Sequence, residues 1–210
     1  PAFGPVYSPP GGTILFSQPI TTDKFSEEFR LSGANDAFDW LGGLYYTKEE
    51  SDLIQKLDRA AASGFSGSVF SGSNISDYEE RAVFADVTFH LTDAFDIQIG
   101  GRYAENEQNY RVLSVVDTPA QILFGEGEND LFRFDDSSFT WLVAPTYHLN
   151  PDLMAYVRVA TGYRPGGPNT ATPGAAPTFA PDTVTNYELG IKGNALAGTL
   201  NFDATVFQID

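Results

Sequence analysis

The chain has 210 residues, with 28 acidic against 12 basic side chains and a formal net charge of −16. This surplus of acids argues against nucleic acid or another polyanion as a partner, because phosphate binding needs an excess of Lys and Arg. No apolar run approaches the roughly 20 residues that a membrane-spanning helix needs. The absence of cysteine removes disulfides and thiolate metal sites.

Alternation of apolar and polar residues predicts an all-β chain built from four hairpins. From residue 83 to 91 the odd positions are apolar, and the alternation restarts after a turn at residues 92–94. Several of the predicted strands, about eight in all, have the nine to eleven residues that cross a bilayer when tilted. The predicted apolar positions are, in chain order, Phe25, Phe29 and Leu31 with Phe38, Trp40, Leu44 and Tyr46; Val83, Ala85, Val87, Phe89 and Leu91 with Ile97, Ile99, Gly101 and Tyr103; Phe139, Trp141, Val143, Pro145, Tyr147 and Leu149 with Val157, Val159 and Tyr163; and Tyr187, Leu189 and Ile191 with Leu200, Phe202, Ala204 and Val206.

One phrase occurs twice: TFHLTDAF begins at Thr88 and TYHLNPDL begins at Thr146. Both copies lead a strand into a tight turn, so the repeat is interpreted as a hairpin turn. His90 and His148 occupy the same position of the repeat, two residues before the turn and on the polar face. Because they belong to separate hairpins, they need not be neighbours, and solvated or hydrogen-bonded side chains near one rim are expected rather than a shared metal site.

Short turns alternate with long connections along the chain. The turns are GAND, TDA, NPD and NALAG, and the long connections span residues 49–80, 105–136 and 164–183. In an antiparallel meander alternate connections lie at the same end, so one end carries tight turns and the other long loops. This predicts an antiparallel transmembrane β-barrel, a meander of hairpins with short periplasmic turns and long extracellular loops. A soluble β-sandwich binding module, which also alternates, is the alternative.

Two segments carry local predictions. GFSGSVFSGSN, residues 64–74, is predicted to be a Ser/Gly-rich loop, and it contains no nucleophile elbow. Pro145 lies inside a predicted strand and has no N–H to donate, so it should mark a bulge, an edge or a local break. We find no catalytic cluster in the sequence and expect no enzymatic activity.

Four phrases resemble, in their usual order, those of TonB-dependent outer-membrane receptors. The phrases are FSEEFRLSG with DWLGGLYYTKEE, FHLTDAFDIQIGGRYAENE, YHLNPDLMAYVRVATGYRPGGPN and TVTNYELGIKGNALAGTLNFDATVFQID. The resemblance implies a Gram-negative outer-membrane barrel of about 22 strands around an N-terminal plug. It implies uptake of a scarce solute, with an iron-siderophore complex as our expectation, driven through the TonB complex. A passive porin-type channel is the alternative, and no cofactor is implied.

On this resemblance, residues 1–210 are expected to be part of a receptor β-barrel domain, with the plug and the barrel ends outside the chain. The expected partners are the lipid bilayer, the TonB complex acting through the plug, and a small-molecule ligand such as a ferric siderophore; no nucleic acid is expected. An open sheet of eight strands has two unpaired edges. Closure of this piece alone is therefore not expected.

Candidate ligand contacts lie on the polar face and beside the loops. The Pro/Gly/Ala-rich loop at residues 164–182 and the loop after Tyr46 are expected to help cover the outer mouth, because long loops on a rigid scaffold usually carry recognition. The three candidate arginines would meet an anionic ligand, and ion pairing in the lumen with Asp86, Glu188 or Asp203 is the alternative. The candidate contacts are Arg102, Tyr156, Arg158, Tyr163 and Arg164.

Overall fold

The computed structural model describes residues 13–60, 67–116, 121, 126–169, 176, 178–196 and 198–210. Within these residues the chain forms antiparallel strands, and none of the described segments is a helix long and apolar enough to cross a membrane. The strands are β1 (Thr13–Ser17), β2 (Ile20–Ala34), β3 (Phe38–Ala60), β4 (Gly67–Thr92), β5 (Phe95–Val116), β6 (Asn129–Asn150), β7 (Leu153–Arg164), β8 (Gly167–Pro168), β9 (Thr178–Phe179), β10 (Asp182–Ala195) and β11 (Leu200–Ile209).

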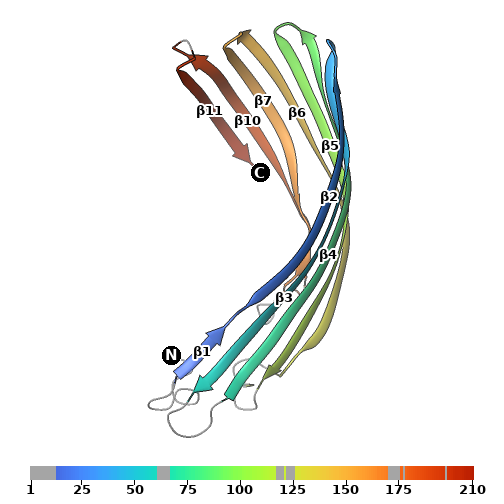
Figure 1. The fold of residues 1–210 in the computed structure, drawn as a ribbon, viewed down its shortest axis with the longest axis vertical. Coiled ribbons are helices and arrows are strands. Elements are labelled where there is room, and N and C mark those ends of the chain that lie inside the picture. The colour runs from blue at the N-terminus through green and yellow to red at the C-terminus, as the bar shows by residue number, and fades with distance from the viewer. Residues whose placement is uncertain are drawn as a thin grey trace. The chain divides into compact units, whose positions relative to one another are not determined.

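The main sheet follows the chain as a meander (Figure 1). Its strand order is β1-β3-β4-β5-β6-β7-β10-β11, and β2 also pairs with β3. β1 and β2 are therefore successive pieces of one strand position, separated at Gln18 and Pro19, where the Pro19 carbonyl accepts from the Ile54 N–H at 3.0 Å. The prediction of about eight antiparallel strands is confirmed. β8 and β9 form a separate two-stranded sheet.

The main sheet is open in this chain. Among the described residues β11 pairs with β10, and no pairing joins it to β1 or β2 at the other end of the strand order. The expectation that this piece does not close by itself is confirmed.

Two of the three long connections predicted from the sequence, residues 49–80 and 105–136, are largely strand. β3 continues to Ala60 and β4 resumes at Gly67, while β5 continues to Val116 and β6 resumes at Asn129. The predicted loop at residues 64–74 is wrong from Gly67 onward, and its first three residues lie outside the described part. Polar cross-strand pairs hold these extensions together, such as the Ser73 hydroxyl on the Asp52 carboxylate at 2.7 Å, so they lack the apolar alternation that reveals a strand.

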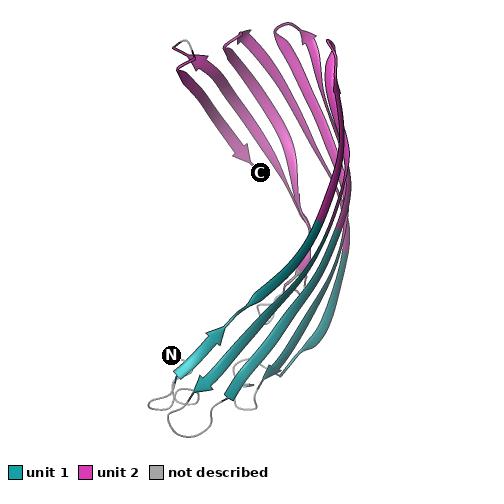
Figure 2. Ribbon diagram, viewed as in Figure 1, with its two compact units in different colours: residues 1–25, 48–79, 107–134 teal, residues 26–47, 80–106, 135–210 magenta. Residues whose placement is uncertain are grey.

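The chain divides into two compact units (Figure 2). Unit 1 comprises residues 1–25, 48–79 and 107–134, and unit 2 comprises residues 26–47, 80–106 and 135–210. Unit 1 has a small hydrophobic cluster in which Val69 and Val116 are buried, with Ile14, Leu57 and Phe70 packed against them. The buried apolar residues described in unit 2 are all alanines: Ala82, Ala104 and Ala144. Unit 2 therefore buries no large apolar side chain among its described residues.

Most of the exposed large apolar side chains of unit 2 instead lie on one face, although Phe207 and Ile209 of β11 are exposed on the other. A soluble sandwich would bury such an apolar face against a second sheet, whereas a barrel wall leaves it to lipid. The exposure therefore favours the transmembrane wall. The exposed residues of unit 2 that fall on the predicted apolar face are Phe29, Leu31, Trp40, Leu44, Val83, Phe89, Leu91, Ile99, Tyr103, Phe139, Trp141, Tyr147, Leu149, Val157, Tyr187, Leu189, Ile191, Leu200, Phe202 and Val206. We call this surface the apolar face and the opposite surface of unit 2 the polar face.

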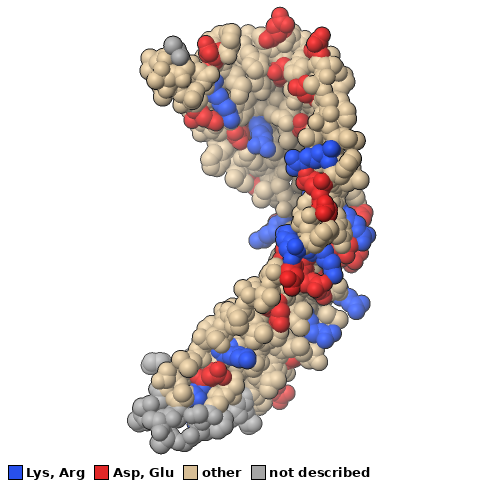
Figure 3. All heavy atoms as spheres, in the orientation of Figure 1, with Lys and Arg blue, Asp and Glu red and all other residues tan. Residues whose placement is uncertain are grey.

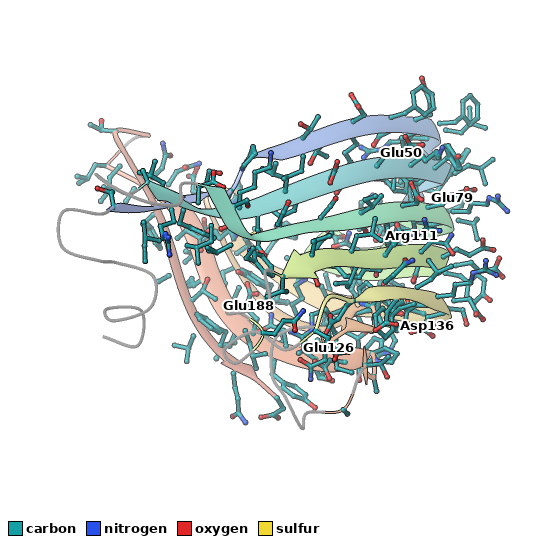
Figure 4. The ribbon with its side chains drawn as sticks, turned by 90° about the horizontal axis from the view of Figure 1, so that it is seen from below. Glu50, Glu79, Arg111, Glu126, Asp136 and Glu188 are labelled. Atoms are coloured by element: carbon teal, nitrogen blue, oxygen red, sulfur yellow. The ribbon has the colours of Figure 1, made fainter. Side chains whose placement is uncertain are left out.

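The exposed positions change character along β5. Exposed and covered residues alternate from Tyr103 to Arg111, but Glu105 and Glu107 take the exposed positions directly after Tyr103. In unit 1 charged residues come from three neighbouring strands, β3, β4 and β5, at Glu50, Glu79 and Arg111 (Figure 4). The apolar stretch of β5 therefore ends at an aromatic residue and is followed by charge.

Pro145 leaves the register of β6 unchanged. Val143 pairs with Val159 and Thr146 pairs with Tyr156, which is one continuous alignment with β7. The register shift lies between His148 and Asn150, next to the turn. Because β6 is an interior strand and the register shift lies elsewhere, Pro145 marks neither an edge nor the bulge. A local break, in which the ladder lacks one N–H donor, is the remaining interpretation.

Candidate functional site: the polar face and the turn-side rim

Arg102 projects from β5 onto the polar face and is already paired. Its guanidinium donates to the Glu80 carboxylate at 2.5 Å and lies 5.5 Å from the ring centroid of Tyr45. The predicted alternative partner, Asp86, instead accepts from the Gln98 amide at 2.9 and 3.0 Å. Arg102 therefore forms an ion pair in the wall, with a different acid from those the sequence suggested.

Tyr156 lies flat across β10 at Gly190. A Cβ built at Gly190 would overlap Cε1 and Cζ of the Tyr156 ring, so only glycine leaves room for the ring there. From this position the Tyr156 hydroxyl donates to the Glu188 carboxylate at 2.5 Å and lies 3.2 Å from the Thr205 hydroxyl. The Lys192 ammonium lies 5.2 Å from the ring centroid, within cation–π range, and is also paired with Asp203 at 3.0 Å. Tyr156 thus links β7, β10 and β11 on the polar face.

Tyr163 reaches the polar face, although the alternation placed it on the apolar face. Its hydroxyl donates to Asp136 and accepts from the amide of the buried Asn106 at 3.4 Å. The ladder is irregular beside it, because the Thr161 hydroxyl, rather than a backbone carbonyl, accepts from the Trp141 N–H at 2.9 Å. The two partners of the Tyr163 hydroxyl, Asn106 and Asp136, occupy covered positions of β5 and β6, so the predicted face of Tyr163 was wrong.

Arg164 closes the base of the Pro/Gly-rich loop. Its guanidinium is paired with Asp182 at the far end of the loop and lies 5.5 Å from the ring centroid of Phe179. Gly167 pairs with Phe179 and Pro168 with Thr178 in the short β8–β9 sheet. Within the described residues, the two ends of this loop are therefore held together by charge, a ring contact and backbone pairing.

Arg158 differs from the other candidates because it is exposed and has no ion-pair or hydrogen-bond partner among the described residues. It lines a hollow of about 190 Å³ together with Arg102, and Asp86, Gly100, Thr140 and Leu142 also contribute to this hollow. Of the five predicted contacts, the structure brings these two arginines together. Tyr156, Tyr163 and Arg164 do not line the same hollow.

The turn-side rim holds a row of four side chains on neighbouring strands. Asp96 accepts from both histidines, with its Oδ1 2.9 Å from His90 Nδ1 and its Oδ2 2.9 Å from His148 Nε2. His90 Nε2 also lies 3.4 Å from the carboxylate of Asp39. The row therefore runs through β3, β4, β5 and β6. His90 and His148 meet through a carboxylate that sequence reasoning did not single out, and no group of the described residues has the geometry of a metal site.

The repeated phrase is explained by backbone hydrogen bonds between successive hairpins. The His90 N–H donates to the Ala37 carbonyl, and the His148 N–H donates to the Ala94 carbonyl, both at 2.8 Å. The Asn194 N–H donates in the same way to the Asp152 carbonyl at 2.8 Å. Each hairpin is thus fastened to the turn of the one before it. Acidic side chains lie along the edge that carries these turns (Figure 3).

Replacing Asp96 by asparagine should loosen this rim. An asparagine amide keeps one acceptor oxygen and puts an NH2 group in place of the other, so one of the two histidines loses its acceptor. Because both histidines are about one-third exposed, we expect amide exchange at His90 and His148 to rise on the order of threefold, the scale of solvent-exposed pairs. Hydrogen exchange with mass spectrometry checks this. Asp93→Asn is the matched control in the adjacent turn, and equal exchange in both variants would contradict a fastening role for Asp96.

Comparison with known sequences identifies the family. The family described as "TonB dependent receptor-like, beta-barrel" matches residues 3–210. The pesticin receptor of Yersinia pestis is 28% identical over 188 residues, which cover 87% of this chain and 26% of that protein. The pesticin receptor of Yersinia enterocolitica is 27% identical over the same coverage. This chain therefore spans about a quarter of the length of the curated relatives it matches.

Solved structures share the fold. The ferric yersiniabactin uptake receptor FyuA from Yersinia pestis aligns with a TM-score of 0.78 at 23% identity, covering 93% of this chain and 29% of that chain. The siderophore receptor PiuA from Acinetobacter baumannii aligns with a TM-score of 0.67 at 14% identity, covering 90% of this chain and 32% of that chain. The meander of long strands and the match over residues 3–210 agree: this chain belongs to the TonB-dependent receptor β-barrel family.

Proposed function

We propose that this chain is part of the wall of an outer-membrane receptor that imports an iron-siderophore complex, with energy supplied by the TonB complex. The observation that carries the proposal is the division of unit 2 into an exposed apolar face and a hydrogen-bonded polar face. A wall with lipid on one side and a hydrated lumen on the other requires this division. Transport is the established role of the family, so we expect no catalytic activity.

We base the proposed placement in the outer membrane on the residues that border the apolar face. Exposed aromatic residues, Tyr103 and Trp141, lie on the side away from the tight turns, and on β5 charged residues follow directly. Interfacial aromatic residues followed by charge are typical of the boundary of a lipid-facing band. The lipid bilayer is therefore the first partner we propose.

The proposed substrate class comes from the relatives. One of the matched structures is described as an uptake receptor for ferric yersiniabactin and another as a siderophore receptor. We propose a ferric siderophore as the ligand of this protein as well. The plug domain and the remaining strands would belong to the rest of the protein, and coupling to the TonB complex would run through that plug.

Uptake of radiolabelled iron tests this proposal. A strain that makes no siderophore and lacks its own receptors is given the full-length gene and supplied with iron-55 bound to yersiniabactin, and with iron-55 bound to other siderophores in parallel. We expect uptake of at least one complex that stops when the tonB gene is deleted, while binding to the cell surface remains. The empty vector is the control for uptake that does not depend on this protein.

The outcomes separate the alternatives. Uptake that persists without TonB would indicate a passive channel. A full-length protein that accumulates in the soluble fraction and binds no membrane would contradict the barrel itself. Surface binding without uptake of any complex would contradict import while leaving the receptor assignment in place.

A further inference from the structure

We propose that Arg158 is the anchor of a carboxylate-binding site on the polar face. Arg158 lies in the middle of β7, between the turn at Asp152 and the loop at Arg164, and its side chain is exposed. The proposal rests on the receptor barrel described above in one respect, that the polar face lines a lumen. It goes beyond it by assigning a ligand chemistry to one residue of the wall.

Charge pairing on the polar face sets Arg158 apart. The other cations on the polar face form ion pairs with acidic side chains of this chain. The pairs are Arg30 with Glu28, Arg102 with Glu80 at 2.5 Å, and Lys192 with Asp203 at 3.0 Å. Arg158 alone among the described cations of unit 2 has no interaction of this kind. The wall therefore leaves one guanidinium for an outside partner.

Glu188, the acidic residue nearest to Arg158 in the strand register, forms no ion pair with it. Glu188 pairs with Arg158 across β7 and β10, but its Oε1 accepts from the Tyr156 hydroxyl at 2.5 Å and its Oε2 from the Asn186 amide at 3.4 Å. Tyr156 is held in that position by the absence of a side chain at Gly190. Both oxygens of Glu188 are thus engaged within the wall.

There is room for an anionic group beside Arg158. In the continuous register of β6 and β7, the small residue Ala144 stands opposite Arg158, and Gly100, Thr140 and Ala160 line the adjoining hollow of about 190 Å³. The Asp86 carboxylate lies in the same hollow and would repel an anion that approached it. The ligand carboxylate should therefore sit at the Arg158 side.

The chemistry selects a carboxylate. A guanidinium presents parallel N–H donors that match the two oxygens of a carboxylate. An unpaired guanidinium in contact with water has little cost in free energy. A group that excludes water from the guanidinium must supply a negative charge, because a desolvated and unpaired charge is strongly unfavourable. That carboxylate can come from an acidic side chain of another segment of the protein or from a soluble solute, and the two sources are distinguishable by experiment.

Arginine-specific modification of the full-length receptor tests the site. The purified protein in detergent is treated with phenylglyoxal, and the rate of modification of Arg158 is followed by peptide mass spectrometry with and without citrate as the soluble carboxylate. Sodium chloride at matched ionic strength is the control for screening. Arg102, which is paired in the wall, is the internal reference for a protected guanidinium.

Two results would support the site. A fast reaction that citrate slows about tenfold at about ten times its dissociation constant, and that chloride does not slow, identifies a soluble carboxylate. A reaction as slow as that of Arg102 without any addition, and unchanged in Glu188→Gln, identifies an acidic side chain from another segment. Two results would overturn it: a fast reaction that citrate does not slow, or a slow reaction that becomes fast in Glu188→Gln, which would make Arg158 an ordinary ion pair of the wall. Because the readout is chemical modification, a failure of siderophore uptake leaves it unaffected.

Discussion

Replacing Gly190 by alanine is expected to destabilise the folded wall by about 1 to 3 kcal/mol, the usual cost of adding volume to a filled site. The added methyl group would overlap the Tyr156 ring, which lies directly across β10 at this point. Tyr156 would have to leave, and its hydrogen bonds to Glu188 and Thr205 would be lost with it. The three strands β7, β10 and β11 would lose the side chain that joins them.

The free energy of unfolding of the full-length protein in lipid vesicles, measured in urea, checks this expectation. Gly42→Ala is the matched control, because a Cβ there meets its nearest neighbour, the Phe84 carbonyl oxygen, at an ordinary 3.7 Å. That variant should stay within about 0.5 kcal/mol of the parent.

A double-mutant cycle identifies the cause. With Tyr156→Ala in the background, Gly190→Ala should cost little, because nothing remains for the methyl group to strike. An undiminished cost in that background would show that the ring is not the reason for glycine at this position. The cycle separates the steric argument from any general intolerance of β10 to substitution.

The sequence predicted the strands of unit 2 well because one physical pattern governs them. Val83 to Leu91 alternate in sequence, and Val83, Phe89 and Leu91 are exposed on one face of β4 as the alternation requires. The same reasoning failed in unit 1, where polar cross-strand pairs such as Gln108 with Ser76, 3.0 Å apart, interrupt the alternation and apolar packing is limited to a small cluster around Val69 and Val116. Alternation detects a strand only where its two faces meet different surroundings.

The candidate site depended on register, which local sequence does not reveal. The alternation placed both Arg102 and Asp86 on the polar face, and both line the same hollow, yet Arg102 pairs with Glu80 while Asp86 accepts from the Gln98 amide. The two histidines were recognised as equivalent positions of a repeat. Their meeting at Asp96 follows from how successive hairpins are fastened, which involves three strands at once.

Glycine was the signal that sequence reasoning left unused. Gly190 falls on the polar face between Glu188 and Lys192, and a glycine inside a strand is a known indication of close approach by another group. That indication does not name the group. Only the pairing of Gly190 with Tyr156 across β7 and β10 shows that an aromatic ring fills the space.

Arginine at position 206 is expected to prevent stable insertion, whereas arginine at position 207 should be tolerated. Val206 pairs with Leu189 on the apolar face, and Phe207 pairs with Glu188 on the polar face. The two residues are adjacent on β11 and similarly exposed, at 76% and 65%, so they differ mainly in the face they occupy. A lipid-facing arginine at mid-membrane costs about 2 to 4 kcal/mol, while an arginine at position 207 would lie beside a carboxylate.

The comparison uses the full-length protein, with the amount of folded receptor in isolated outer membranes measured by its heat-modifiable migration on gels and its unfolding free energy measured in vesicles. We expect Val206→Arg to lower both and Phe207→Arg to leave both near the parent values. Equal tolerance would mean that the apolar face does not meet lipid, and equal damage would mean that β11 rejects arginine on either face. Only unequal damage of the expected sign assigns the exposed apolar surface to the bilayer, because neighbouring positions share depth, strand and degree of exposure.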